Sequence, residues 1–109
     1  MSDTLLVLTN LPDAASAERI ARLLVEQRLA ACVNILAQCT SVYRWNAAIE
    51  TAAEVPLLIK TTRARYAELQ AALAEAHPYE LPEIVAVPLV AGLPAYLAWV
   101  AAETTPPQA

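Results

Sequence analysis

The sequence predicts one α+β domain in which two helices cover one face of an antiparallel sheet. The chain has 109 residues, which is the length of a single domain. Two stretches with helical periodicity alternate with short apolar runs, and in the middle of the chain two such runs follow each other directly. Hydrophobic residues make up 58% of the chain and charged residues 17%, so the chain is apolar enough to form a core.

The first strand and the first helix are predicted from apolar spacing and from one cap. Thr4–Thr9 is a short apolar run typical of a buried strand, and a proline follows it at position 12. Asp13 is a favourable N-cap residue. Beyond it, apolar residues recur at helical spacing and predict a helix over 14–30. These residues are Ala17, Ile20, Ala21, Leu24 and Leu29.

The middle of the chain predicts a long β-hairpin. Cys32–Trp45 and Ile49–Thr62 are rich in β-branched or aromatic residues, and Asn46–Ala48 joins them. Pro56 lacks an N–H group, which predicts a sheet edge or a bulge at that position. A strand of ~14 residues spans about 46 Å, whereas a compact domain of this size is about 34 Å across. The hairpin therefore extends past its own core, and we expect it to join a neighbouring chain in an oligomer.

The last third of the chain completes the fold. Arg63–Ala76 has a helical apolar stripe, Ile84–Val90 is an apolar strand in which Pro88 predicts an edge or a bulge, and Ala95–Ala102 is a short third helix. Glu103–Ala109 is predicted to be a frayed tail. The order β-α-β-β-α-β, followed by one extra helix, predicts the ferredoxin-like split βαβ arrangement over a single domain, residues 1–109.

Charge and composition exclude several classes of protein. The net charge is −4, so no basic face is available for a nucleic acid. The apolar runs are far shorter than the ~20 residues that cross a bilayer. The N-terminus has no basic region typical of a signal peptide, so we expect a cytoplasmic protein with reduced cysteines. One histidine and two cysteines cannot complete a four-ligand zinc site.

Six short motifs resemble those of the CutA divalent-cation-tolerance family, in the same order and over nearly the whole chain. They are Leu-Ala-Ala-Cys-Val-Asn (29–34), Ser-Val-Tyr-Arg-Trp (41–45), Leu-Ile-Lys-Thr (58–61), His-Pro-Tyr-Glu (77–80), Pro-Glu-Ile (82–84) and Tyr-Leu-x-Trp (96–99). The resemblance implies a ferredoxin-like protomer, a tightly packed homotrimer, and a cytoplasmic protein linked to tolerance of copper and other divalent cations.

The resemblance also implies a copper site, from which this chain departs. Family members proposed to bind metal have a cysteine at the end of the first strand and a His-His pair before Pro-Tyr. This chain has Thr9, Ala76 and His77 at those positions. Any binding of Cu²⁺ or another divalent cation is therefore expected to be weak or to use other ligands, with His77 and Cys32 as the candidates. Both also have ordinary structural interpretations, His77 as a residue at a helix end and Cys32 as a small buried side chain.

Two further expectations concern the hairpin. Where the family has a glycine and then a lysine, this chain has Ala47 and Ala48, and alanine disfavours a positive φ. The turn is therefore predicted to be wider or of another type. Cys32 and Cys39 are seven residues apart, which on one regular strand places them on opposite faces, too distant for a disulfide.

The remaining polar and aromatic motif residues predict a ligand cleft at a subunit boundary. They are Tyr43, Trp45, Glu50, Lys60, Tyr79, Glu80 and Glu83. Lys60 is the only lysine, so it is the candidate to hold an anionic ligand. The same residues are also compatible with a buried network that fixes the register of a trimer, and this second interpretation is somewhat favoured. Tyr43 and Trp45 are two residues apart and share one face of their strand.

The sequence does not favour catalysis, because it has no nucleophile-elbow serine and no glycine-rich phosphate loop. We therefore expect a non-enzymatic trimer that acts in divalent-cation tolerance and binds copper weakly. Two alternatives stay open. One is a small-ligand sensing or signalling trimer similar to the PII-like proteins, and the other is a protein whose function is assembly or interaction.

Overall fold

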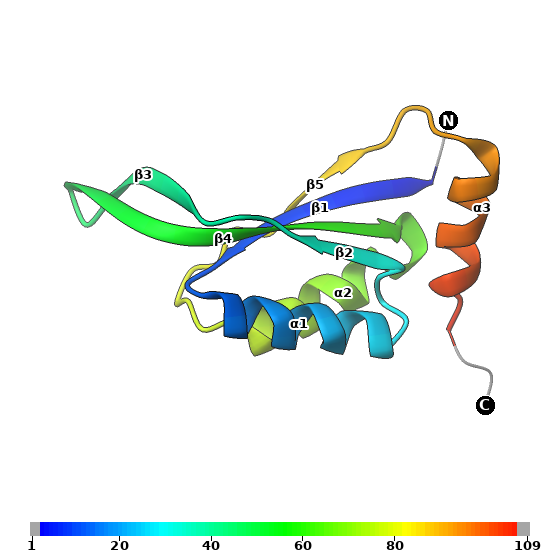
Figure 1. The fold of residues 1–109 in the computed structure, drawn as a ribbon, viewed down its shortest axis with the longest axis horizontal. Coiled ribbons are helices and arrows are strands. Elements are labelled where there is room, and N and C mark those ends of the chain that lie inside the picture. The colour runs from blue at the N-terminus through cyan, green and yellow to red at the C-terminus, as the bar shows by residue number, and fades with distance from the viewer. Residues whose placement is uncertain (1–2, 107–109) are drawn as a thin grey trace.

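The computed structural model describes residues 3–106, which form the predicted α+β sandwich (Figure 1). The elements in chain order are β1 (Thr4–Leu11), α1 (Ala14–Glu26), β2 (Cys32–Ile35), β3 (Cys39–Trp45), β4 (Ala48–Thr62), α2 (Arg63–Ala76), β5 (Val85–Pro88) and α3 (Pro94–Glu103). The sheet order is β2-β4-β1-β5, all pairs are antiparallel, and β3 continues the pairing along β4. Both α1 and α2 lie below one face of the sheet in Figure 1, and α3 lies at one end of the strands.

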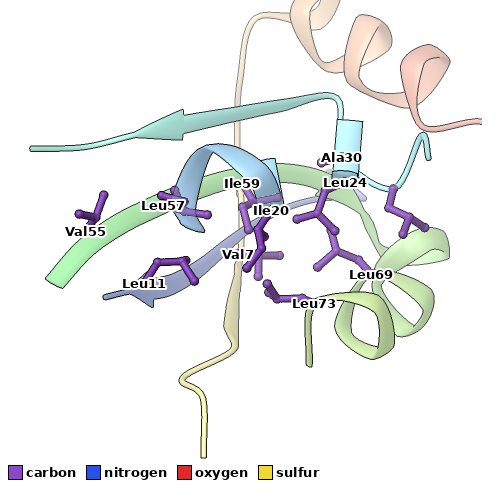
Figure 2. Close-up of a cluster of buried hydrophobic side chains, with 12 residues drawn as sticks. Val7, Leu11, Ile20, Leu24, Ala30, Val55, Leu57, Ile59, Leu69 and Leu73 are labelled. Atoms are coloured by element: carbon purple, nitrogen blue, oxygen red, sulfur yellow. The ribbon is translucent and has the colours of Figure 1, made fainter. Parts of the chain in front are cut away.

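The core lies between this face of the sheet and the two helices (Figure 2). Alternate residues of β1 and β4 are buried, as expected for strands with one face on a core. The buried residues of α1 recur at helical spacing. Central members of the cluster are Val7, Leu11, Ile20, Leu24, Leu57, Ile59, Leu69 and Leu73.

The first helix ends at Glu26, four residues before the predicted end. Arg28 adopts a φ of 58°, which no right-handed helix contains. The backbone N–H groups of Leu29 and Ala30 then donate to the carbonyl of Leu24 at 2.9 and 3.1 Å. At the other end of α1, the Asp13 side chain accepts a hydrogen bond from the Ser16 N–H at 2.7 Å, which confirms the predicted cap.

The predicted strand Cys32–Trp45 is interrupted, whereas β4 runs through 15 residues without a break. Ile35 pairs with Leu57 and Cys39 with Glu54, so three residues of one strand oppose two of the other. This is a one-residue β-bulge. The Leu36 N–H donates to the carbonyl of Pro56 at 3.0 Å, and Pro56 has no N–H to return the bond. The bulge predicted at Pro56 is confirmed, and it lies in the partner strand.

The bulge corrects the expected placement of the cysteines. Cys32 pairs with Lys60 and Cys39 pairs with Glu54, and these two β4 residues are six positions apart. Residues an even number of positions apart on a strand share a face, so both cysteines lie on the same face. The prediction of opposite faces was wrong because it assumed a regular strand. Both thiols are free.

The hairpin extends beyond the helical layer, as its predicted length required (Figure 1). The molecule measures 45 × 31 × 23 Å, and the outer parts of β3 and β4 project along its longest axis. Val42 and Ile49, near the tip, are 68% and 62% exposed. An exposed apolar ribbon of this kind is typical of a surface that another chain covers.

The turn at the hairpin tip is tighter than the sequence predicted. Trp45 pairs directly with Ala48, which leaves a loop of only Asn46 and Ala47. Their φ angles are 49° and 65°, as in a type I′ turn. The prediction of a wider turn was wrong because the pairing along β3 and β4 determines the loop length, and Ala47 adopts the unfavourable φ that this length requires.

Replacing Ala47 with glycine is expected to raise the free energy of unfolding by about 1 kcal/mol, because glycine adopts positive φ without a steric penalty. Chemical denaturation at fixed protein concentration measures the change. Ala48→Gly is the matched control, since Ala48 lies in β4 and glycine within a strand destabilises it. Equal effects of the two variants would contradict strain at Ala47.

Hydrogen bonds from Arg28 join the C-terminal part to the end of α1. β5 lies at a sheet edge, which confirms the interpretation of Pro88. Helix α3 ends at Glu103, and the next residue, Thr104, is 1% exposed. The Arg28 guanidinium donates to the carbonyl oxygens of Ala102 and Thr105 at 3.3 and 3.0 Å. The expected fraying of the tail 103–109 stays a prediction, and residues 107–109 lie outside the described part. Within residues 3–106, no helix has the length and apolarity needed to cross a membrane.

Candidate functional site

A groove of about 880 Å³ lies between the β3–β4 hairpin and the segment that follows α2. It brings together five of the seven residues predicted for the ligand cleft. These are Tyr43, Trp45, Tyr79, Glu80 and Glu83. Direct pairing of Cys39 with Glu54 and of Trp45 with Ala48 places the two strand aromatics on the same hairpin face as Glu54. We call this hollow the Glu54 groove, after the carboxylate that lines it.

Glu54 lines the groove but is not among the residues that the sequence predicts for it. It is only 9% exposed, and the Tyr79 hydroxyl donates a hydrogen bond to its carboxylate. Burial, together with the hydrogen bond and the negative charge of Glu54, raises the pKa of Tyr79 well above its usual value. The phenol therefore stays protonated and remains a donor. A lone acidic residue within the apolar stretch Ala52–Ile59 was the available signal.

His77 joins the end of β1 to the segment that follows α2. One ring nitrogen, Nδ1, accepts the backbone N–H of Tyr79 at 3.2 Å. The other, Nε2, lies 2.9 Å from the carbonyl oxygen of Asn10, so it carries the proton and donates to that oxygen. The rings of His77 and Tyr79 have centroids 4.9 Å apart. The imidazole thus fixes the position of Tyr79 at the groove.

His77 is expected to make stability depend on pH. Its pKa lies below the ordinary value of 6.5, mainly because burial disfavours the charged imidazole. The unfolded chain then binds more protons than the folded chain, so stability falls as the pH decreases from about 6.5 towards the folded-state pKa. Denaturation at a series of pH values measures this slope. The His77→Gln variant should lose this contribution, and an unchanged slope in the variant would contradict the assignment.

Four predicted site residues do not line the Glu54 groove: His77, described above, and Lys60, Cys32 and Glu50. Lys60, on β4, pairs with Cys32 on β2 and donates a hydrogen bond to the side chain of Asn34. Cys32 also shares a hydrogen bond with Tyr96 of α3, at the end of the sheet away from the hairpin tip. Glu50 pairs with Tyr43 nearer the tip and does not line the groove. Within one chain, the predicted cleft therefore forms without Lys60 or Glu50.

The donor set at the copper position implied by the resemblance does not fit a metal ion. Thr9 is buried, and its hydroxyl has no hydrogen-bond partner within the described chain. Ala76 offers no donor, and both ring nitrogens of His77 are already hydrogen-bonded. Over residues 3–106 no group of three or more histidine, cysteine or acidic side chains is arranged to hold a metal. The described part of one chain thus contains no preformed metal cage.

Known proteins share both this sequence pattern and this fold. Residues 5–103 match the family described as CutA1 divalent ion tolerance protein. The divalent-cation tolerance protein CutA of Thermus thermophilus is 44% identical over 98 residues, which cover 90% of this chain and 95% of that protein. Protein CutA of Mus musculus is 45% identical over 89 residues, covering 82% of this chain and 50% of the mouse protein. The chain therefore spans about half the length of this mouse relative.

Solved structures agree with the sequence matches. The crystal structure of CutA from Xylella fastidiosa superposes with a TM-score of 0.93 at 46% identity, and the match covers 95% of this chain and 100% of that one. The Thermus thermophilus structure gives a TM-score of 0.91 at 42% identity and covers 94% of this chain and 99% of that one. From the family match, the identities and the shared fold it follows that this chain belongs to the CutA1 divalent ion tolerance family.

Proposed function

We propose that this protein acts in divalent-cation tolerance as a non-enzymatic homotrimer in the cytoplasm, and that its molecular activity is the binding of a small ligand in the Glu54 groove. The observation that supports ligand binding is a concave surface of about 880 Å³ in which a buried carboxylate and a protonated tyrosine lie beside exposed aromatic rings. Concave sites with a few convergent polar groups are the usual form of ligand sites.

The chemistry of the groove favours binding over catalysis. A general acid or base works best when its pKa lies near the operating pH and the group can reach the substrate. The pKa of Tyr79 is raised far from neutrality, and its hydroxyl is committed to Glu54. Both nitrogens of His77 are committed to the backbone. The hydrogen bonds of Tyr79 and His77 stabilise the geometry of the groove and leave both side chains poorly placed to transfer protons to a ligand.

The apolar surface of the protomer supports the homotrimer. Val85 and Val87 of β5 are 47% and 44% exposed, and β5 and β2 are both sheet edges. Exposed apolar edge strands favour pairing with another chain. Sedimentation analysis should give a species with three times the 11.7 kDa mass of the chain. A stable monomer at micromolar concentration would contradict the trimer.

Ligand binding is tested by a thermal-shift panel of small anions, cations and neutral metabolites with the wild-type protein, Trp45→Leu and Glu26→Gln. A ligand of the groove should raise the melting temperature of the wild type in proportion to occupancy. The shift should disappear in Trp45→Leu and persist in Glu26→Gln, whose side chain lies on α1. If no compound shifts the wild type, or if every shift persists in Trp45→Leu, the groove is not the functional site.

Direct binding of copper is the second candidate, and it would be one way to act in the divalent-cation tolerance for which the relatives are named. It requires His77 or Cys32 to act as a ligand, helped by residues of neighbouring chains. Copper should be titrated into chelator-treated wild type and His77→Gln, with the heat and the mass of the complex measured together. Whole-number binding per trimer that is lost in the variant would support this candidate. No binding, or binding that the variant keeps, would show that His77 is not a copper ligand.

A further inference from the structure

The charges that line the Glu54 groove have one sign. Glu54, Glu80 and Glu83 contribute carboxylates, and no lysine, arginine or histidine is present in the described lining. Lys60, expected from the sequence to hold an anion, pairs with Cys32 outside the groove. We propose that the groove selects an organic cation, an ammonium group on a small apolar body. This inference rests on the proposed ligand-binding function and reverses the ligand charge expected from the sequence.

Glu54 supplies the strongest reason for a cationic ligand. Its carboxylate is largely buried, and none of the three ion pairs found among residues 3–106 includes it. A buried charge is stable only when it is paired and hydrogen-bonded. Tyr79 donates one hydrogen bond, and a carboxylate has about four acceptor positions. An ammonium group provides both the opposite charge and the additional donors.

The aromatic residues favour an organic cation. Tyr43 and Trp45 share the hairpin face of Glu54, and their side chains are 44% and 38% exposed. Tyr79 lines the groove from the opposing segment. The faces of aromatic rings attract ammonium groups and also contact apolar carbon atoms. A ligand with a charged nitrogen and an alkyl body would use both properties.

The dimensions of the groove suit a small organic molecule better than a bare metal ion. Its volume of about 880 Å³ far exceeds the few-ångström shell in which a metal ion gathers its ligands. Over the described chain, no three acidic side chains, with or without cysteine or histidine, converge as metal ligands. A small organic molecule spans such a space and contacts several walls.

Three probes of nearly equal shape separate the effect of charge from that of size. They are tert-butylammonium, tert-butanol and pivalate, titrated calorimetrically into the full-length wild-type protein near neutral pH. We expect tert-butylammonium to bind at least about tenfold more tightly than the other two. Glu54→Gln should weaken its binding about tenfold, and Glu80→Gln, which changes an exposed side chain, should weaken it less. Glu26→Gln, the matched control on α1, should leave binding unchanged.

Each result bears on the inference separately from the proposed function. Preferred binding of pivalate that is lost in Trp45→Leu would contradict the inference of a cationic ligand. The groove would still be a ligand site. Equal binding of all three probes, or no binding of any, would also overturn the inference, and the thermal-shift panel then decides the function independently. Tight binding of tert-butylammonium that neither Glu54→Gln nor Glu80→Gln changes would show that the cation binds outside the Glu54 groove. This result would also contradict the inference.

Discussion

Arg65→Met is expected to lower the free energy of unfolding by about 3 kcal/mol, because it removes a buried guanidinium that satisfies two backbone carbonyls. Arg65 is 6% exposed, and it donates to the carbonyl oxygens of Gln27 and Arg28 at 3.5 and 3.3 Å. These carbonyls lie at the end of α1, where no further helical turn can pair them. Methionine keeps most of the apolar volume but donates no hydrogen bond.

Two variants isolate this contribution of Arg65. Glu68→Gln removes the ion-pair partner at 3.0 Å, but its side chain is 69% exposed, so it should lower stability by less than about 1 kcal/mol. Arg63→Met changes an exposed arginine two residues away and should stay within about 0.5 kcal/mol of the wild type. Chemical denaturation at equal protein concentration compares the three. A similar small loss in all of them would contradict the capping role.

His77→Ala is expected to lower the free energy of unfolding by about 2 to 4 kcal/mol. The substitution removes both hydrogen bonds of the imidazole and leaves a void where a 7% exposed ring was packed. The carbonyl of Asn10 and the N–H of Tyr79 lose their partners. Amide hydrogen exchange should show faster exchange at Tyr79, while the amides of the β1–β4 ladder become only uniformly less protected.

The His77→Gln variant separates the hydrogen bonds from the packing. Glutamine can donate to one backbone group and accept from another, so part of the stability and of the Tyr79 protection should return. If Tyr79 exchanges at the wild-type rate in His77→Ala, the imidazole does not hold this segment. Because His77→Ala disturbs the groove through Tyr79, a loss of copper in that variant alone would not identify a ligand, whereas a loss in His77→Gln would.

Local signals in the sequence predicted most of the fold. Asp13 marked the start of α1, and the apolar spacing identified the helices. Pro56 marked the bulge because proline cannot donate a backbone hydrogen bond in any surroundings. The end of α1 escaped prediction because Arg28 adopts a positive φ that its side chain type does not indicate. That conformation is stabilised by α3 and Arg65, which are distant in the sequence.

The candidate site was predicted only in part, for a geometric reason. Tyr43, Trp45 and Tyr79 belong to motifs that the fold brings together. Lys60 and Glu54 are six residues apart on one continuous strand, and this separation is about 20 Å. Lys60 belongs to a motif and Glu54 does not, so motif membership pointed to the residue that lies outside the groove. The burial of Glu54 depends on the segment after α2, whose path no local pattern indicates.

The bulge opposite Pro56 determines which side chains of β3 line the groove. It does so by selecting one of two possible alignments of β3 with β4. If β3 slid by one position against β4, every side chain of β3 would change sides, and Tyr43 would point away from Glu54. The two-residue loop at Asn46 and the extra residue near Leu36 together select the observed alignment. An insertion at either end of β3 would therefore damage the groove although every groove residue stayed in the sequence. It would exchange the two faces of β3 and turn the aromatic side chains away.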